Sequence, residues 1–189
     1  MYSRTLTKNS GFTIIEILVI IIIVLILAAV VLPKFFDMER KNRQSNVQEN
    51  MQIVDMAVKK YATSNKGNYP LRCDDPALKS FFPGGNTNAQ APLGGNYPEN
   101  PFTHMPEAPF PGNVTDVEQT RQSSPADLGG PRMAGKIFYN ALIPAEKEKA
   151  IGYAIQGAGR DGRAIAGQTP NTTSVLSNLI TQPAKSQAH

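Results

Sequence analysis

The first third of the chain divides, by its pattern of apolar and polar positions, into an unbroken apolar run and an amphipathic continuation. The run from Phe12 to Leu32 holds 21 residues and a single charge, that of Glu16. It is apolar on every face, which is typical of a membrane span or of the core of a helix bundle. As a helix it would be about 31 Å long, close to the hydrocarbon thickness of a bilayer. The pattern therefore predicts a transmembrane or filament-core helix over residues 12–33.

Beyond Pro33 the pattern becomes amphipathic. Five apolar residues recur at intervals of three and four, which places them on one face of a helix: Val47, Met51, Val54, Val58 and Tyr61. This face is expected to pack under a soluble domain, so residues 34–64 are predicted to be an amphipathic helix. We expect one helix from about Phe12 to Ser64. Pro33 should loosen or kink it locally, because proline removes a backbone hydrogen bond and crowds the preceding turn.

The remaining residues, 65–189, have the composition of a loop-rich globular domain. The chain contains 15 glycines and 15 prolines, and 14 of each follow residue 64. The segment "NYPENPFTHMPEAPFPG" alone has five prolines in 17 residues, a density that excludes central strands and long helices.

Short regular elements are nevertheless predicted inside this domain. "DDP" ahead of "ALKSFF" indicates a short helix, and "GKIFYNA" and "IGYAIQG" indicate two strands joined by the charged turn "AEKEKA". The second strand is expected to be half-buried, because Ile151, Tyr153 and Ile155 alternate with small or polar residues. "TTSVLSNLI" is predicted to be a short amphipathic helix that packs Val175, Leu176, Leu179 and Ile180.

Glu16 separates the possible explanations of the apolar run. A cleaved secretory signal would have a shorter apolar core, followed by a small-residue cleavage site. A plain signal anchor explains the length of the run but leaves Glu16 unexplained, since a carboxylate at that depth costs about 2.5 kcal/mol or more unless it is paired. A third hypothesis accounts for the charge and for the residues that precede it.

The stretch "KNSGFTIIEILVIIIIVLILAAVVLPKF" closely resembles the N-terminus of type IV prepilins and pseudopilins. The family pattern is a short basic leader that ends in glycine, then phenylalanine, a glutamate four residues on, and an apolar run. Lys8, Gly11, Phe12 and Glu16 match it, and Pro33 matches a proline that recurs near the end of the run. The resemblance covers about 30 of the 189 residues, and its motif is specific in spacing, composition and position.

The resemblance implies an α+β, pilin-like lollipop: a long N-terminal helix, membrane-spanning in its first half, packed on a small antiparallel sheet with long loops. Residues 1–11 would be a leader that a prepilin peptidase removes by cutting Gly11–Phe12, after which it methylates the Phe12 amine. Glu16 would neutralise that amine on a neighbouring subunit. Both charges are costly alone in hydrocarbon and far less so as a pair.

The resemblance also implies a function, a location and partners. The chain would be a structural subunit that polymerises with itself into a helical filament. Its other partners would be the membrane, the prepilin peptidase, an inner-membrane assembly platform with its ATPase, and minor pilins or pseudopilins. It would cross the bacterial inner membrane once, with the leader cytoplasmic and the C-terminal domain periplasmic. Counting basic residues favours the opposite orientation, but processing requires a cytoplasmic leader, and we give that requirement more weight.

The type of filament is less sharply indicated. "GNYP", "GKIFYN" and "GYAIQGAGRDG" loosely resemble the major pseudopilin of type II secretion, whose C-terminal region binds calcium. Strong calcium sites use several carboxylates, whereas Asp161 is the only acid in "GAGRDGR". We therefore favour a plain glycine-rich turn, with Asp161 a weak candidate calcium ligand and no other metal or cofactor expected. The chain lacks the cysteine pair of many Gram-negative type IV pilins, which favours a pseudopilin or a pilin of the disulfide-free kind; we favour the pseudopilin, with a major or minor pilin as the alternative.

Composition gives little support to other classes of function. The net charge is +4, and no basic stripe is interleaved with aromatic residues, so no direct binding of nucleic acid is expected. Cys73 is the only cysteine and cannot form an intramolecular disulfide. His104 with Cys73 or Glu107 lacks the spacing of a catalytic set. We expect no enzymatic activity. A membrane-anchored enzyme or binding domain that matches the motif by accident is the alternative from another class.

Overall fold

The computed structural model of the protein describes residues 11–88, 93–144 and 149–179. By internal contacts the chain forms two compact units, Met1–Lys41 and Asn42–His189. The leader residues Arg4 and Lys8, most of "AEKEKA", and Ile180 lie outside the described residues.

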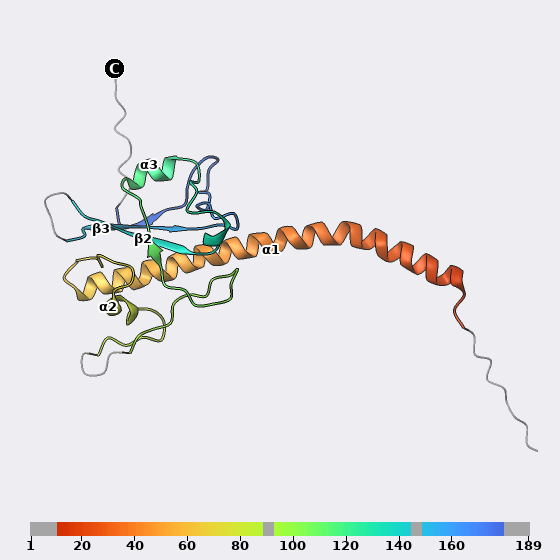
Figure 1. Cartoon of the computed structure of the whole chain (residues 1–189), viewed down its shortest axis with the longest axis horizontal. Helices are drawn as coiled ribbons and strands as arrows, with labels where there is room; N and C mark the ends of the chain where they lie inside the picture. The colour runs from red at the N-terminus through yellow and green to blue at the C-terminus, as the bar shows by residue number, and fades with distance from the viewer. Residues whose placement is uncertain (1–10, 89–92, 145–148, 180–189) are drawn as a thin grey trace, which may run out of the picture. The chain divides into compact units, whose positions relative to one another are not determined.

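Helix α1 runs from Ile14 to Ser64, 51 residues in all (Figure 1). This confirms the single long helix expected from the two hydrophobic patterns, and the helix continues through Pro33. It ends where Lys66 and Gly67 adopt positive φ angles of 56° and 83°. The Gly67 N–H then donates to the Ala62 carbonyl at 2.8 Å. Such a left-handed cap pairs carbonyls that the helix itself leaves without partners.

Within the first unit, the apolar part of α1 is exposed along its whole length. No residue from Phe12 to Leu32 is buried, and the large apolar side chains range from 45% exposed at Ile17 to 88% at Ile14. Among the described residues α1 is the one helix long and apolar enough to cross a membrane, with a mean hydropathy of 3.6 over its most apolar window.

The second unit contains a four-stranded sheet in the order β1-β2-β3-β4. The predicted strands are β2, Ile137–Leu142, and β3, Gly152–Gly157, which pair antiparallel from Ile137↔Gly157 to Leu142↔Gly152. Two short strands extend the sheet: β1, Phe110–Pro111, is parallel to β2, and β4, Leu176–Ser177, is antiparallel to β3.

The prediction of a helix over "TTSVLSNLI" was wrong. Its apolar residues have helical spacing, but Leu176 pairs with Ile155 and Ser177 with Ala154, so the segment is the fourth strand. Pairing with the open edge of β3 satisfies backbone groups over a stretch too short to form a stable helix by itself.

Short helices flank the sheet. The predicted one is α2, Pro76–Lys79, where Asp75 caps the Ala77 N–H at 2.8 Å. Helix α3, Val117–Gln122, was not expected; Asp116 caps the Gln119 N–H at 2.9 Å. A 3₁₀ turn over Pro131–Met133 completes the set of described helices.

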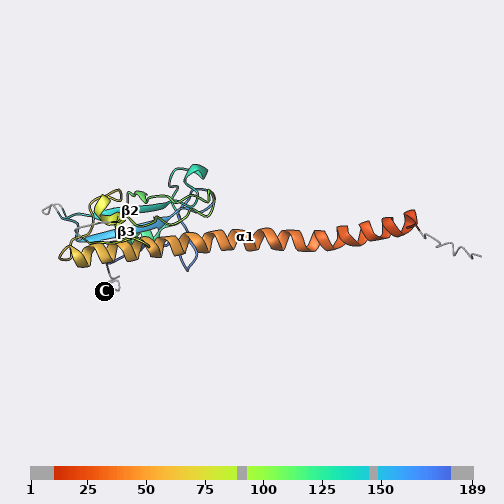
Figure 2. The same cartoon turned by 90° about the horizontal axis from the view of Figure 1, so that it is seen from below.

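The second half of α1 lies along one face of the sheet (Figure 2). The core that they share consists of buried side chains from α1, β2 and β3, among them Val47, Met51, Val54, Val58, Tyr139, Tyr153 and Ile155. At Gly157 helix and strand come so close that an added Cβ would lie 2.6 Å from a Val47 methyl carbon. The helical stripe therefore packs as predicted, with Tyr61 partly buried at its end.

The opposite face of the sheet is also covered. A second cluster of buried side chains joins Val114, Val117 of α3, Ala154 of β3 and Val175. Every residue of β3 is consequently buried, which corrects the expectation of a half-buried strand; Ile151 is 48% exposed and lies outside it. The whole is a pilin-like α+β layout, in which a long, apolar N-terminal helix packs against a small, mostly antiparallel sheet.

Candidate processing and assembly site

The residues of the expected cleavage site precede the first turn of α1. Gly11, Phe12 and Thr13 are non-helical and exposed, and Phe12 is 76% accessible. Among the residues that the structure describes, and apart from Gly11 and its chain neighbours, no atom lies within 4 Å of the position that a Cβ of Gly11 would occupy. Since a protease needs an accessible backbone outside regular structure, the Gly11–Phe12 peptide has the local geometry that cleavage requires.

Glu16 folds back over the start of the helix onto Thr13. Its Oε2 accepts hydrogen bonds from the Thr13 N–H and the Thr13 hydroxyl, each at 2.8 Å. The Glu16 N–H donates to the Thr13 hydroxyl oxygen at 3.4 Å. This reciprocal arrangement is a capping box, which supplies partners to backbone N–H groups that the helix cannot satisfy.

Thr13 is a site residue that the sequence analysis missed. The family resemblance alone suggested a role for Glu16, although "TIIE" carries the Thr-x-x-Glu signature of a capping box. An ionised carboxylate has about four acceptor positions on its two oxygens. The two bonds from Thr13 therefore leave Glu16 with capacity to accept from a cation as well.

Pro33 lies inside α1, 17 residues after Glu16, or about 26 Å along the helix. The structure does not bring it near the cleavage and capping residues.

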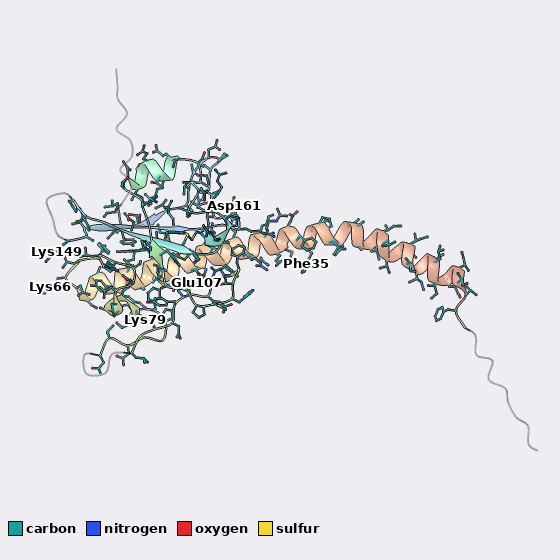
Figure 3. All side chains as sticks on the ribbon, in the orientation of Figure 1. Phe35, Lys66, Lys79, Glu107, Lys149 and Asp161 are labelled. Atoms are coloured by element: carbon teal, nitrogen blue, oxygen red, sulfur yellow. The ribbon has the colours of Figure 1, made fainter. Side chains whose placement is uncertain are left out.

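Asp161 lies in a hydrogen-bonded turn after β3 (Figure 3). Its Oδ1 accepts from the Arg163 N–H at 3.1 Å, while the Gly159 N–H donates to the Arg163 carbonyl at 2.7 Å. Gly162 has a φ of 77° and packs so closely on Gly130 that a Cβ could not be accommodated. Within residues 11–88, 93–144 and 149–179, no three His, Cys, Asp or Glu side chains are grouped to hold a metal ion.

The residues considered as a catalytic set do not interact as one. His104 is exposed and pairs with Glu99 at 3.1 Å. Cys73 is buried, and its burial raises the pKa of the thiol, which lowers its reactivity. In the part of the chain that the structure describes, no hydrogen bond joins His104 to Cys73 or Glu107.

No protein-family model, curated protein or solved structure matches this chain. The class of protein is therefore defined by its own geometry. It has a pilin-like architecture, with an N-terminal helix that is long and apolar enough to span a membrane and whose first turn contains Glu16 in a capping box with Thr13.

Proposed function

We propose that this protein is a structural subunit of a type IV pilus-like filament. A prepilin peptidase would remove residues 1–11 and methylate the amine of Phe12, and the mature chain would polymerise through α1. The observation that carries the proposal is the apolar run of α1, in which no residue is buried and whose first turn holds a carboxylate four residues after Phe12.

The exposed helix supports assembly because its apolar side chains need cover. In the inner membrane lipid tails would cover them, and in a filament the helices of neighbouring copies would do so. The exchange of lipid for helix contacts lets one segment act first as a membrane anchor and then as the filament core.

Glu16 supports assembly because a cation from a neighbouring copy would offset the cost of its charge in hydrocarbon. Cleavage after Gly11 creates an α-ammonium group on Phe12, and a neighbouring copy would place that cation against Glu16. Two opposite charges in hydrocarbon are tolerated as a pair, whereas breaking a buried pair costs about 3–5 kcal/mol. The pairing would thus favour copies stacked in one register.

Mass spectrometry of the protein from cells that produce it tests the proposal. We expect a mature chain that begins with N-methylated Phe12. An intact Met1, or an N-terminus beyond Leu32, would contradict the proposal and favour a plain anchor or a cleaved signal.

Among filament types we propose a type II secretion pseudopilin-like subunit, supported by the loop-rich domain with its small, mostly antiparallel sheet and a single cysteine. Deletion of the gene separates the types. Loss of protein secretion with normal surface pili is expected. Loss of pili, twitching or DNA uptake with normal secretion would instead indicate a pilus subunit.

A further inference from the structure

The C-terminal end of the apolar run is oblique, because one side of α1 stays apolar further along the helix than the other. Leu32, Phe35 and Phe36 are spaced i, i+3 and i+4 and therefore share one side, which we call the aromatic side. Phe35, labelled in Figure 3, and Phe36 are 62% and 54% exposed, and their rings meet edge-on with centroids 6.2 Å apart. The first charged residue on the aromatic side is Glu39.

On the opposite side of α1 the charges begin earlier. Lys34, Asp37 and Lys41 are spaced i, i+3 and i+7, which at about 100° per residue places them opposite the aromatic side. We call this the charged side, and its last apolar residue is Val30. Basic and acidic side chains nearly balance in this stretch, so the two sides differ in where charge begins and not in net attraction to an ion.

The offset between the two sides has the size that a tilted membrane span requires. The first charge moves by five residues, from Lys34 to Glu39. That is about 7.5 Å along a helix roughly 10–12 Å wide. A flat boundary that passes through both positions is inclined by about 35° to the cross-section of the helix, which is within the roughly 0–40° of tilt that spanning helices show.

The length of the apolar surface gives the same angle. From Phe12 to Phe36 the helix would measure about 36 Å, which is longer than a hydrocarbon layer of about 30 Å. A helix longer than the layer tilts to match it, and at a tilt of about 35° the projection of this segment is close to 30 Å.

We propose that Phe35 and Phe36 bind the lipid surface at the extracytoplasmic boundary between headgroups and acyl chains, and that they tilt α1 toward the aromatic side before assembly. The inference rests on the proposed function, in which α1 is a membrane anchor. Lipid is the partner because the aromatic side continues the apolar run without a break, and interfacial helices bury Phe and Leu at this boundary. On the charged side, Lys34 can keep its stem in lipid and its ammonium in water.

Two probe positions on opposite sides of the helix measure the direction of tilt. Full-length chains with Cys73→Ala carry a nitroxide on either Leu32→Cys or Val30→Cys, in vesicles of phosphatidylethanolamine and phosphatidylglycerol. Relaxation by oxygen and by a water-soluble nickel chelate reports the depth of each probe. In an upright helix Leu32 lies about 3 Å nearer the extracytoplasmic surface than Val30. A tilt of about 35° lowers the aromatic side by about 6 Å, so the Leu32 probe should be the deeper of the two.

Substitutions on either side should level the end of the apolar surface. Phe35→Ser with Phe36→Ser shortens the aromatic side, and Lys34→Leu lengthens the charged side. Each change should reverse the order of depths and make the Leu32 probe the shallower one. Met38→Ser is the matched control, because Met38 is 65% exposed but lies between the two sides. It should leave the Leu32 probe deeper.

The outcomes separate this inference from the proposed function. A Leu32 probe that is shallower than the Val30 probe in the chain without levelling substitutions overturns the inference and leaves the proposed function intact. So does an order that neither levelling change alters. An order that depends on the ratio of protein to lipid also overturns it, because a neighbouring copy would then cover the aromatic side. If the chelate reaches both probes from water, α1 is not inserted, which contradicts the proposed function itself.

Discussion

The Glu16 carboxylate accepts hydrogen bonds from both the N–H and the hydroxyl of Thr13, each at 2.8 Å. Glu16 thus already has a structural role in the single chain, in addition to the charge pairing that we propose for the filament. The two roles can be separated by chemistry. Glutamine occupies the same position in capping boxes, but it carries no charge with which to neutralise an ammonium group.

Glu16→Gln and Glu16→Ala should both be inserted and cleaved normally but fail to assemble. Gln keeps the cap and loses the charge, and Ala loses both. An unpaired terminal amine in the filament core would cost about 3–5 kcal/mol. Sheared filaments quantified by immunoblot measure the outcome. Assembly of the Gln variant together with failure of the Ala variant would show that Glu16 serves only as a cap.

Thr13→Val should fray the first turn of α1, because it removes the hydroxyl that serves as donor and acceptor to Glu16. Loss of an N-terminal cap typically costs about 1 kcal/mol, equivalent to roughly fivefold faster amide exchange. Hydrogen exchange of the Glu16 amide in detergent micelles measures this. Thr13→Ser retains the hydroxyl and should exchange at the original rate; equal rates in all three proteins would exclude the cap.

A fragment of residues 42–189 should be soluble and cooperatively folded. It lacks the apolar run but keeps Val47, Met51, Val54 and Val58, which form the core with β2 and β3. Circular dichroism should show one substantial helix with limited strand. A fragment of residues 55–189 is the matched control. It loses the first three of these side chains and should aggregate or remain unfolded, so equal stability of the two fragments would disprove the role of the stripe.

Gly157→Ala should destabilise that fragment by about 1–3 kcal/mol, the usual cost of overpacking a core. The new Cβ would lie 2.6 Å from the Val47 Cγ1 and 2.9 Å from the Met51 sulfur. Thermal unfolding should shift down by about 2–4 °C for each kcal/mol. Gly159→Ala is the control, because its nearest neighbour is an Asp161 carboxylate oxygen at 3.4 Å. A Gly157→Ala protein as stable as this control would contradict the close approach of helix and strand.

Tyr153 should make the fragment less stable at high pH. Burial, together with the hydrogen bond that its hydroxyl donates to Asp55, raises the pKa of Tyr153. Below about pH 10 both states hold the proton and the stabilisation is complete; above it the unfolded state loses its proton first, so stability falls as pH rises.

Tyr153→Phe should release about one proton fewer on unfolding at high pH, so the free energy of unfolding should fall less steeply with pH, by about 1.4 kcal/mol per pH unit. Burial also raises the pKa of Tyr139, so part of the fall in the free energy of unfolding with pH should remain. At neutral pH the substitution should cost about 1.5–3 kcal/mol, because the hydrogen bond goes to a carboxylate. Urea unfolding between pH 8 and about pH 11 measures both effects, and an unchanged slope would show that Tyr153 is not protected from ionisation.

Helix α1 and the candidate processing residues could be predicted from the sequence, because both depend on near neighbours in the chain. The apolar run and the stripe from Val47 to Tyr61 are helical periodicities, and the Asp75 cap of α2 is equally local. The resemblance to type IV prepilins pointed to Gly11, Phe12 and Glu16, and the Thr-x-x-Glu spacing could have added Thr13.

Tertiary structure alone decided what depends on partners far away in sequence. The segment at Leu176 became a strand because the edge of β3 was open to pair with it. Strand β3 is buried on both faces because Val114, Val117 and Val175 cover the face that carries its small residues. Small side chains occur on exposed and on buried faces alike, so the sequence alone did not predict this burial. One pocket of the second unit likewise gathers residues as far apart in sequence as Leu71 and Ile143. Periodicity records which face of an element is apolar, whereas only the folded chain determines what meets that face.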